Sequence, residues 1–119
     1  MADLITDDGD ELMADLLDGT VSAPVMKVGW GTGAGTTAKG DTTLFTEASE
    51  SRVAPTASQP SAKQNQLIAT LTADGAKTIT NAGVLDADSG GTLIAKSDFA
   101  GIGLALNDSI QFTFQINHA

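Results

Sequence analysis

Strict alternation of hydrophobic and polar residues marks the clearest predicted strand, Ser109 to Asn117. Isoleucine and phenylalanine occupy every second position, with Gln, Thr and Asn around them. Because successive side chains of a strand point to opposite faces, this pattern predicts one buried face and one solvated face. The alternation also occurs upstream, over residues 102–106, and Asn107-Asp108 between the two segments is typical of a turn.

Further strand patterns precede this one. Residues 64–72 and 77–84 flank Asp74-Gly75, and a turn dipeptide of this kind between two apolar runs predicts a β-hairpin. Ser89-Gly90-Gly91 predicts another turn, which leads into a short strand over residues 92–96. The earlier strand candidates are short and lie at residues 25–28, 42–45 and 51–53.

A different period marks the N-terminal segment, where apolar residues recur on a helical repeat. The apolar stripe consists of Leu12, Met13, Leu16 and Leu17. Asp8 or Asp10 is placed to cap this helix, and Gly19 is placed to end it. A helix of about ten residues is not stable alone in water, so it must dock on its own domain or on a neighbouring protein.

The fold class follows from the spacing of the strands. After residue 20 no helical pattern separates them, which predicts a mainly β fold, an antiparallel β-sandwich or a barrel-like domain. Residues 54–63 contain two of the three prolines and predict an exposed loop. With 119 residues the chain is one small domain. We therefore divide it into an acidic arm with a short amphipathic helix, residues 1–20, and a single β domain, residues 21–119.

The net charge of −9 is concentrated in the arm. Residues 1–20 hold seven acidic residues and no basic one, whereas the rest of the chain holds eight acidic and six basic residues. Binding to a phosphate backbone needs clustered Lys and Arg, so nucleic acid is not an expected partner. No apolar run approaches the roughly 20 residues that span a bilayer, and no secretory leader pattern is present. Neither a membrane partner nor a signal peptide is expected.

The stretch VGWGTGAG at residues 28–35 alternates glycine with other residues around Trp30, the only tryptophan. Two of its glycines and Ala34 match the dinucleotide-binding pattern G-x-G-x-x-A, but that site needs a helix to begin there, and no helical period follows. In the P-loop alternative at residues 35–42, Asp41 occupies the position of the phosphate-binding lysine. We interpret the stretch as a glycine-rich strand exit at which chain segments pack closely around Trp30.

The residues offer no convincing catalytic or metal-binding arrangement. His118 is the only histidine and has no partner pattern of the Ser–His–Asp or Cys–His kind, so we expect neither an enzyme nor a cofactor. Asp86 and Asp88 begin like a calcium loop, but Ser97 stands where an EF-hand requires glutamate. A turn in which the Asp side chains bond local amides is the preferred interpretation, and metal binding by these two residues stays open.

The helical stripe has two interpretations, a cover over its own sheet or an interface with another protein. Its place at the terminus, set apart from the β domain by charge and by period, favours the interface. Trp30 is either a buried core residue or an intersubunit contact. The candidate interface residues are Leu12, Met13, Leu16, Leu17 and Trp30.

Two blocks of the chain resemble a group of small structural proteins of tailed bacteriophages. The first block, residues 28–53, contains VGWGTG, then DTTLFTE at residues 41–47, and Arg52. The second block, residues 80–116, contains NAGVLDADSGGTL followed by LALNDSIQFT. The resemblance covers about half of the chain, and residues 1–20 do not share it.

This resemblance implies a non-enzymatic virion protein, made in the host cytoplasm, that decorates and stabilises the outer capsid surface. Its partner would be the major capsid protein, and it would be a homo-oligomer, with a trimer favoured. Small interfaces repeated over a lattice add up to a large stabilisation. On this interpretation residues 1–20 are a docking arm that orders on binding.

Two other classes of protein remain to be compared with the capsid decoration protein. The closer alternative is a β-sandwich protein of the tail or baseplate, which would be present in few copies per particle. A carbohydrate-binding module would need exposed aromatic residues, but the chain is 4% aromatic and has no tyrosine.

Overall fold

The computed structural model describes residues 2–20 and 25–117 of the chain. It is mainly β, with 49% strand and 10% helix, as the alternating pattern predicts. Within the described residues, seven strands form two antiparallel sheets, one of four strands and one of three. The arrangement is sandwich-like and is not a closed barrel, so the first of the two predicted architectures is confirmed and the second is wrong.

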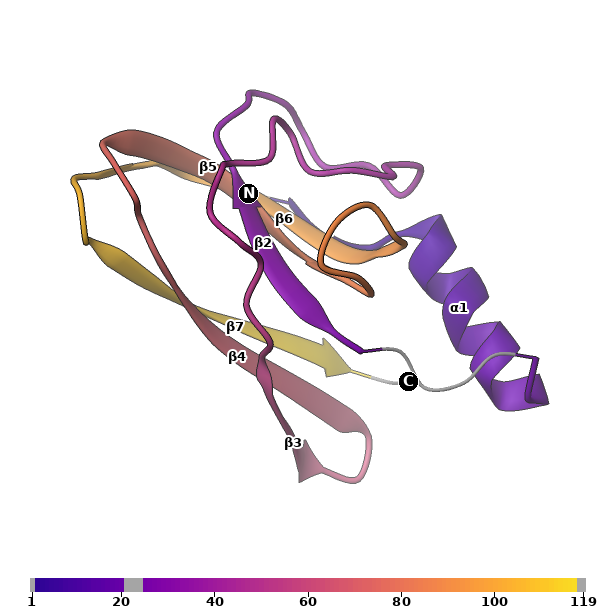
Figure 1. The fold of residues 1–119 in the computed structure, drawn as a ribbon. Coiled ribbons are helices and arrows are strands. Elements are labelled where there is room, and N and C mark those ends of the chain that lie inside the picture. The colour runs from indigo at the N-terminus through magenta and orange to yellow at the C-terminus, as the bar shows by residue number, and fades with distance from the viewer. Residues whose placement is uncertain (1, 21–24, 118–119) are drawn as a thin grey trace.

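The four-stranded sheet has the order β1-β6-β5-β2, and the three-stranded sheet has the order β3-β4-β7 (Figure 1). The elements are β1 (Ala2–Ile5), α1 (Asp7–Asp18), β2 (Lys27–Gly31), β3 (Thr56–Ser61), β4 (Gln64–Thr72), β5 (Lys77–Leu85), β6 (Leu93–Leu104) and β7 (Ser109–Asn117). The β4–β5 and β6–β7 connections cross between the sheets at the end of the molecule opposite α1 (Figure 1).

Two of the alternating segments have the predicted strand bounds, and one predicted pairing is wrong. β4 and β7 match the prediction, β5 extends one residue further, and the two segments after residue 91 belong to the single strand β6. Asp74-Gly75 does not close a hairpin, because β4 pairs with β3 and β7 whereas β5 pairs with β2 and β6. The N–H of Ala73 still donates to the carbonyl of Asp108, at 2.8 Å. The chain therefore leaves one sheet at Ala73 and enters the other at Lys77.

The earlier, less regular segments were predicted less well. β2 covers Lys27–Gly31 instead of residues 25–28, and residues 42–45 form no strand. From the predicted strand at residues 51–53, only Val53 pairs, in an isolated bridge to Val28. The predicted loop at residues 54–63 contains β3, an exposed edge strand. Its pairing with β4 is interrupted beside Pro60, where the missing N–H is tolerated.

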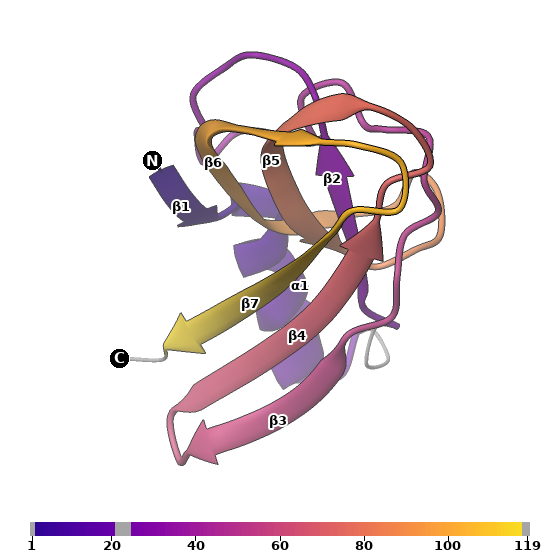
Figure 2. The same cartoon turned by 90° about the vertical axis from the view of Figure 1, so that its left-hand side faces the viewer.

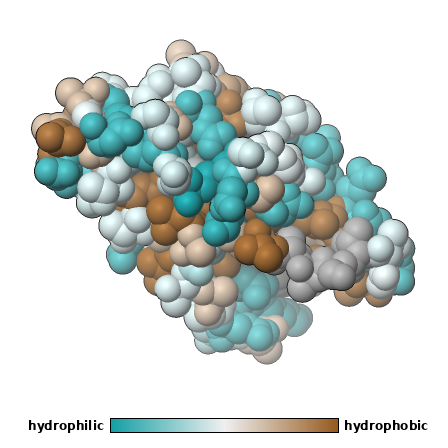
Figure 3. Space-filling model, in the orientation of Figure 1, coloured by the Kyte–Doolittle hydropathy of each residue, from teal (hydrophilic) through white to brown (hydrophobic). Residues whose placement is uncertain are grey.

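The main hydrophobic core lies between the two sheets. It consists of Val28, Trp30, Leu67, Ala69, Leu71, Ala73, Ile79, Ala82, Val84 and Ile94. Phe112 of β7 meets Trp30 edge to face, with the ring centroids 6.2 Å apart. In the space-filling view, hydrophobic groups also reach the surface along the seam between the sheets (Figure 3). Burial of these apolar side chains is the main force that holds the sheets together.

The loop of residues 32–53 covers the other face of the four-stranded sheet. Its Leu44 is buried and clusters with Leu85 and Leu93. Gly29 and Gly83 lie opposite each other in β2 and β5 and make room for this side chain. A Cβ atom on Gly83 would lie 2.9 Å from Cδ2 of Leu44, so a larger residue there would displace the loop.

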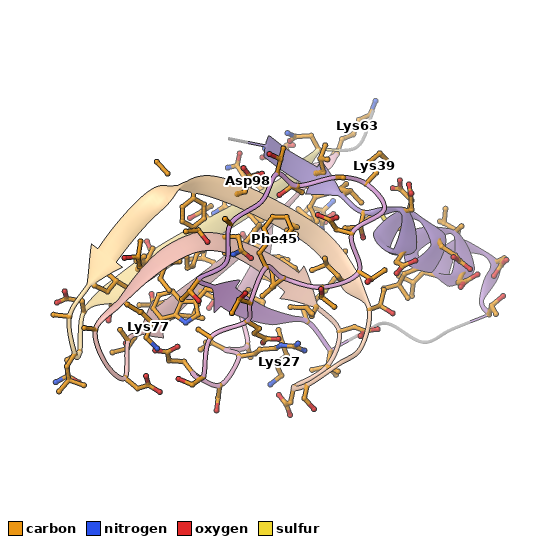
Figure 4. The ribbon with its side chains drawn as sticks, turned by 90° about the horizontal axis from the view of Figure 1, so that it is seen from above. Lys27, Lys39, Phe45, Lys63, Lys77 and Asp98 are labelled. Carbon is orange, nitrogen blue, oxygen red and sulfur yellow. The ribbon has the colours of Figure 1, made fainter. Side chains whose placement is uncertain are left out.

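Asn81 of β5 fixes this loop to the sheet. Its side chain is fully buried, and its Oδ1 accepts the N–H of Phe45 at 3.0 Å. Its Nδ2 donates to the carbonyl of the same residue, also at 3.0 Å. The amide side chain thus pairs with a backbone as a neighbouring strand would. Figure 4 shows Phe45 in the middle of the molecule, between the loop and the strands.

The substitution Asn81→Ala should lower the free energy of unfolding by about 2 kcal/mol, because two partly buried hydrogen bonds are lost. Urea unfolding followed by the fluorescence of Trp30 measures this change. The matched control is Asn117→Ala, which removes an exposed amide and should change stability by less than about 0.5 kcal/mol. Equal stability of the two variants would contradict the role of Asn81.

Candidate functional site

The glycine-rich stretch at residues 28–35 packs against the loop. A Cβ atom on Gly31 would lie 2.4 Å from the carbonyl oxygen of Phe45, and one on Gly35 would lie 2.7 Å from its ring. The structure thus has the close packing that was predicted, but around Phe45 rather than around Trp30. Gly29 lies inside β2, Gly31 is its last residue, and Gly33 and Gly35 follow it, so the stretch forms the exit of a strand, as interpreted. Gly31 and Gly35 must lack a side chain because Phe45 occupies the space that a Cβ atom would need.

Asp41, at the position of the P-loop lysine, pairs with a buried cation. Nζ of Lys96 lies 3.1 Å from Oδ2 of Asp41, 2.9 Å from the carbonyl of Thr43 and 3.1 Å from the ring centroid of Phe45. Burial alone would raise the pKa of Asp41, but hydrogen bonds from the Ala38 amide and from Lys96 outweigh it and lower the pKa. The carboxylate neutralises Lys96 and would repel a phosphate.

Arg52 ties the loop to the β5–β6 turn. Its guanidinium binds both carboxylate oxygens of Glu47, at 2.7 and 2.8 Å. Its Nη1 also donates to the carbonyls of Ala87, at 2.7 Å, and Gly90, at 3.0 Å. The hydrogen bonds that Arg52 donates to the Glu47 carboxylate raise the pKa of Arg52 above its ordinary value. The bidentate pair with Glu47 neutralises the charge of the guanidinium and fixes its orientation. The fixed guanidinium then holds the turn through the carbonyls of Ala87 and Gly90.

Asp86 and Asp88 both have protein partners. Oδ1 of Asp86 accepts a hydrogen bond from the N–H of Thr92 at 2.6 Å. The turn interpretation predicts such a hydrogen bond to a nearby backbone amide. Oδ1 of Asp88 lies 3.2 Å from Nζ of Lys27. Across residues 2–20 and 25–117, no group of three or more His, Cys, Asp or Glu is placed to hold a metal ion. His118 lies outside the described residues.

The N-terminal segment is built into the sandwich. The sequence pattern did not predict β1, which pairs with β6. The helix cap is Thr6, whose Oγ1 accepts the N–H of Gly9 at 3.0 Å and donates to the carbonyl of Leu93. The predicted caps Asp8 and Asp10 are therefore wrong, because both lie within the first turn. Gly19 ends the helix in the left-handed conformation, as predicted.

The helical stripe is divided between two environments. Gly9 lies against β6 so closely that a Cβ atom would be 2.2 Å from the carbonyl oxygen of Ile94. Leu12 and Met13 pack on the core of the same chain. Leu16 is half-buried, whereas the side chain of Leu17 is 91% exposed. The first half of the stripe covers its own domain, and the end of the helix presents Leu17 to solvent.

Trp30 is a core residue rather than an intersubunit contact. It is 1% exposed, and its indole N–H donates to Oε1 of Glu50 at 2.9 Å. The other oxygen of that carboxylate accepts the N–H of Asp74 at 2.9 Å and contacts the ammonium of Lys77. Glu50 thereby joins β2, the loop and the β4–β5 connection. No sequence motif marked Glu50, because its three partners are distant along the chain.

The environment of Glu50 strongly favours its ionised form. Burial alone would raise the pKa of Glu50, but hydrogen bonds from Lys77, from the Asp74 amide and from the Trp30 indole together lower it to about 2. Its carboxylate is therefore a structural anion in the folded protein.

Comparison of the chain with protein-family models and with curated proteins finds no match. None of the helices among the described residues has the length and apolar character needed to cross a membrane. The charged side chains of Lys96, Arg52 and Glu50 connect the loop to the four-stranded sheet and its turns. Of the five residues predicted to form an interface, Leu17 at the end of α1 is the one that is exposed, so this end of the helix remains the candidate interface.

Replacing Glu50 should make the free energy of unfolding depend less on pH in the acidic range. Its folded pKa of about 2 lies below the ordinary 4.5, so its contribution is present above pH 4.5 and is lost as the pH falls to about 2. A shift of this size corresponds to about 3 kcal/mol. Urea unfolding across this range should show a flatter pH dependence for Glu50→Gln than for the wild type. Glu11→Gln, on the exposed side of α1, should keep the wild-type slope, and equal slopes for all three proteins would contradict the assignment.

Proposed function

We propose that this chain is a non-enzymatic structural protein of a tailed-phage virion, which binds the major capsid protein on the outer surface and stabilises the shell. The observation that carries the proposal concerns the two blocks that resemble phage structural proteins. They are far apart in the sequence, yet their residues form one interlocked unit in the structure. Asn81 binds Phe45, Lys96 binds Asp41, and Arg52 binds the β5–β6 turn.

The chemistry of this unit supports a structural role. The carboxylates of Asp41, Glu47 and Glu50 each pair with a cation of the same chain. The pairs of Asp41 and Glu50 join the loop to β6 and β5, whereas the pair of Glu47 with Arg52 lies within the loop. Ion pairs that are complete and hydrogen-bonded fix one arrangement of the chain. A rigid small domain is suited to a lattice component that must withstand force.

We assign capsid contact to the exposed end of α1. β1 and the first half of the helix belong to the sandwich, so the segment 1–20 does not act as a separate arm. The helix stands at one end of the molecule, where a neighbouring protein can reach it (Figure 1). Leu17 lies between two acidic residues in the sequence, the half-buried Asp15 and the exposed Asp18. An apolar residue with an acidic rim would match a capsid surface that carries a pocket and basic side chains.

The substitution Leu17→Ser should weaken binding to capsids that lack the protein. Burial of a leucine contributes about 1.5–3 kcal/mol, so we expect the Kd to rise about tenfold or more. Co-sedimentation of the purified protein with such capsids measures the Kd. The matched control is Leu106→Ser, which removes another exposed leucine, in the β6–β7 connection. Equal binding by the two variants would contradict the assignment to α1.

The location of the protein in purified virions tests the proposed function itself. Antibody labelling and quantitative mass spectrometry should find it over the capsid, in a copy number proportional to the capsid lattice. A few copies confined to the tail would instead support the tail or baseplate alternative.

A further inference from the structure

The three-stranded sheet carries no ionisable side chain. β3, β4 and β7 consist entirely of Ser, Thr, Asn, Gln, Ala, Pro, Leu, Ile and Phe, in a chain of net charge −9. Lys63, in the turn between β3 and β4, points away from the body of the molecule (Figure 4). Two copies of an acidic protein repel each other over most of their surface. This sheet is a surface at which two copies can approach without opposed charges.

β7 is the open edge of this sheet. Among the strands that the structure describes, it pairs with β4 alone, in a continuous register from Ser109 to Asn117. The opposite edge, β3, carries Pro60 and an interruption of its register, which are features that prevent an edge from pairing further. β7 has neither, and it has no charged residue. A long, regular and uncharged edge strand is a template for another strand.

An apolar groove of about 750 Å³ opens between the sheets beside this edge. The face of β7 that carries Phe112 and Phe114 lines one side of it, and β1 and β6 line the other. Both phenylalanines are only half-buried, and Ile102 of β6 is 41% exposed. Figure 2 shows β1 and β7 on the same side of the molecule, at the edges of their two sheets. The domain leaves apolar surface uncovered at this edge.

The sequence of β7 is self-complementary. Residues 110–116 read IQFTFQI in both directions. When two copies of this strand pair antiparallel about a two-fold axis at Thr113, each residue faces one of its own kind. Phe112 lies opposite the partner's Phe114, and Gln111 lies opposite the partner's Gln115. The aromatic row and the amide row stay on their own faces, and cross-strand pairs of these kinds stabilise sheets.

We propose that a second copy of this chain docks on β7, so that the two three-stranded sheets join through antiparallel β7 strands about a two-fold axis at Thr113. The phenylalanines of each copy lie at the mouth of the partner's groove, which is incomplete without them. A two-fold interface of this kind uses the same patch on both copies and closes on itself. The proposal does not rest on the virion role, and it differs from the trimer that the resemblance implies.

A cysteine scan tests the register directly, because the chain contains no cysteine. Directly opposed residues of antiparallel strands have Cα atoms about 4.5–5.5 Å apart, within the range for a disulfide. Thr113→Cys in the full chain should therefore give a disulfide-linked dimer under mild oxidation. Gln111→Cys is the matched control on the same strand and face. Its symmetry mate is four residues away along the partner strand, about 13 Å, which is beyond the reach of a disulfide.

A mixture of the Gln111→Cys and Gln115→Cys proteins should cross-link as a mixed dimer, since these positions are opposed across the axis. The mixed dimer should form faster than either homodimer. Cross-linking of Thr113→Cys no faster than that of Gln111→Cys would overturn the proposal.

Analytical ultracentrifugation of the wild-type chain should show a monomer–dimer equilibrium. Thr113→Lys places two ammonium groups opposite each other at the axis and should weaken the dimer by at least about tenfold. The matched control, Thr70→Lys, adds the same charge to an exposed position on β4 and should have a much smaller effect. A wild-type chain that stays monomeric at high concentration, or that sediments as a trimer, would overturn the proposal. The cysteine pairs decide the case if the lysine variant fails to fold.

Discussion

The placement of the loop of residues 32–53 over the four-stranded sheet depends on the two hydrogen bonds between the Asn81 side chain and the Phe45 backbone. They attach a loop without regular secondary structure to the central part of a sheet. With Phe45 held there, Leu44 occupies the space left by Gly29 and Gly83. The Phe45 ring also covers the buried ammonium of Lys96. The Asn81 amide therefore joins the loop to β5, while backbone hydrogen bonds of Ala48 and Val53 join it to β2.

Ion pairs also hold the loop on the four-stranded sheet, and they make the two sheets differ in charge. Lys96 of β6 binds Asp41 and the carbonyl of Thr43 in the loop. Arg52, paired with Glu47 inside the loop, donates to backbone carbonyls of the β5–β6 turn. Such completed networks avoid the cost of an unpaired buried charge. The charged contacts are thus gathered around the four-stranded sheet, while the strands of the three-stranded sheet carry no charge. One sheet is covered by its own chain, and the other keeps the open edge β7.

A strand could be predicted from the sequence when one of its faces packs on the core and the other faces solvent. β4 and β7 are of this kind, and alternation gave their bounds. β3 is exposed on both faces and β1 has four residues, so neither carries a periodic pattern. The Asp74-Gly75 turn was recognised, but a turn dipeptide is local. Whether the strands beside it pair depends on distant partners, here Glu50 and Asp108.

The candidate site was predicted in part for a related reason. The apolar stripe of α1 identified Leu17, because helical periodicity is visible within a few residues. Asn81, Lys96 and Glu50 carry no local pattern, since their partners lie 36, 55 and 24 residues away. The interpretation of Asp86 as a turn residue is confirmed by its hydrogen bond from the Thr92 amide, whereas the cation beside Asp41 was visible only once the chain was folded.

Native-state hydrogen exchange at the backbone N–H of Phe45 is the most direct test of this account. If the bond to Asn81 holds the loop as part of the folded core, this amide exchanges only when the whole domain unfolds. Its opening free energy should then equal that of the amides in β5. Exchange at rates typical of an exposed loop, while the β5 amides stay protected, would contradict the account.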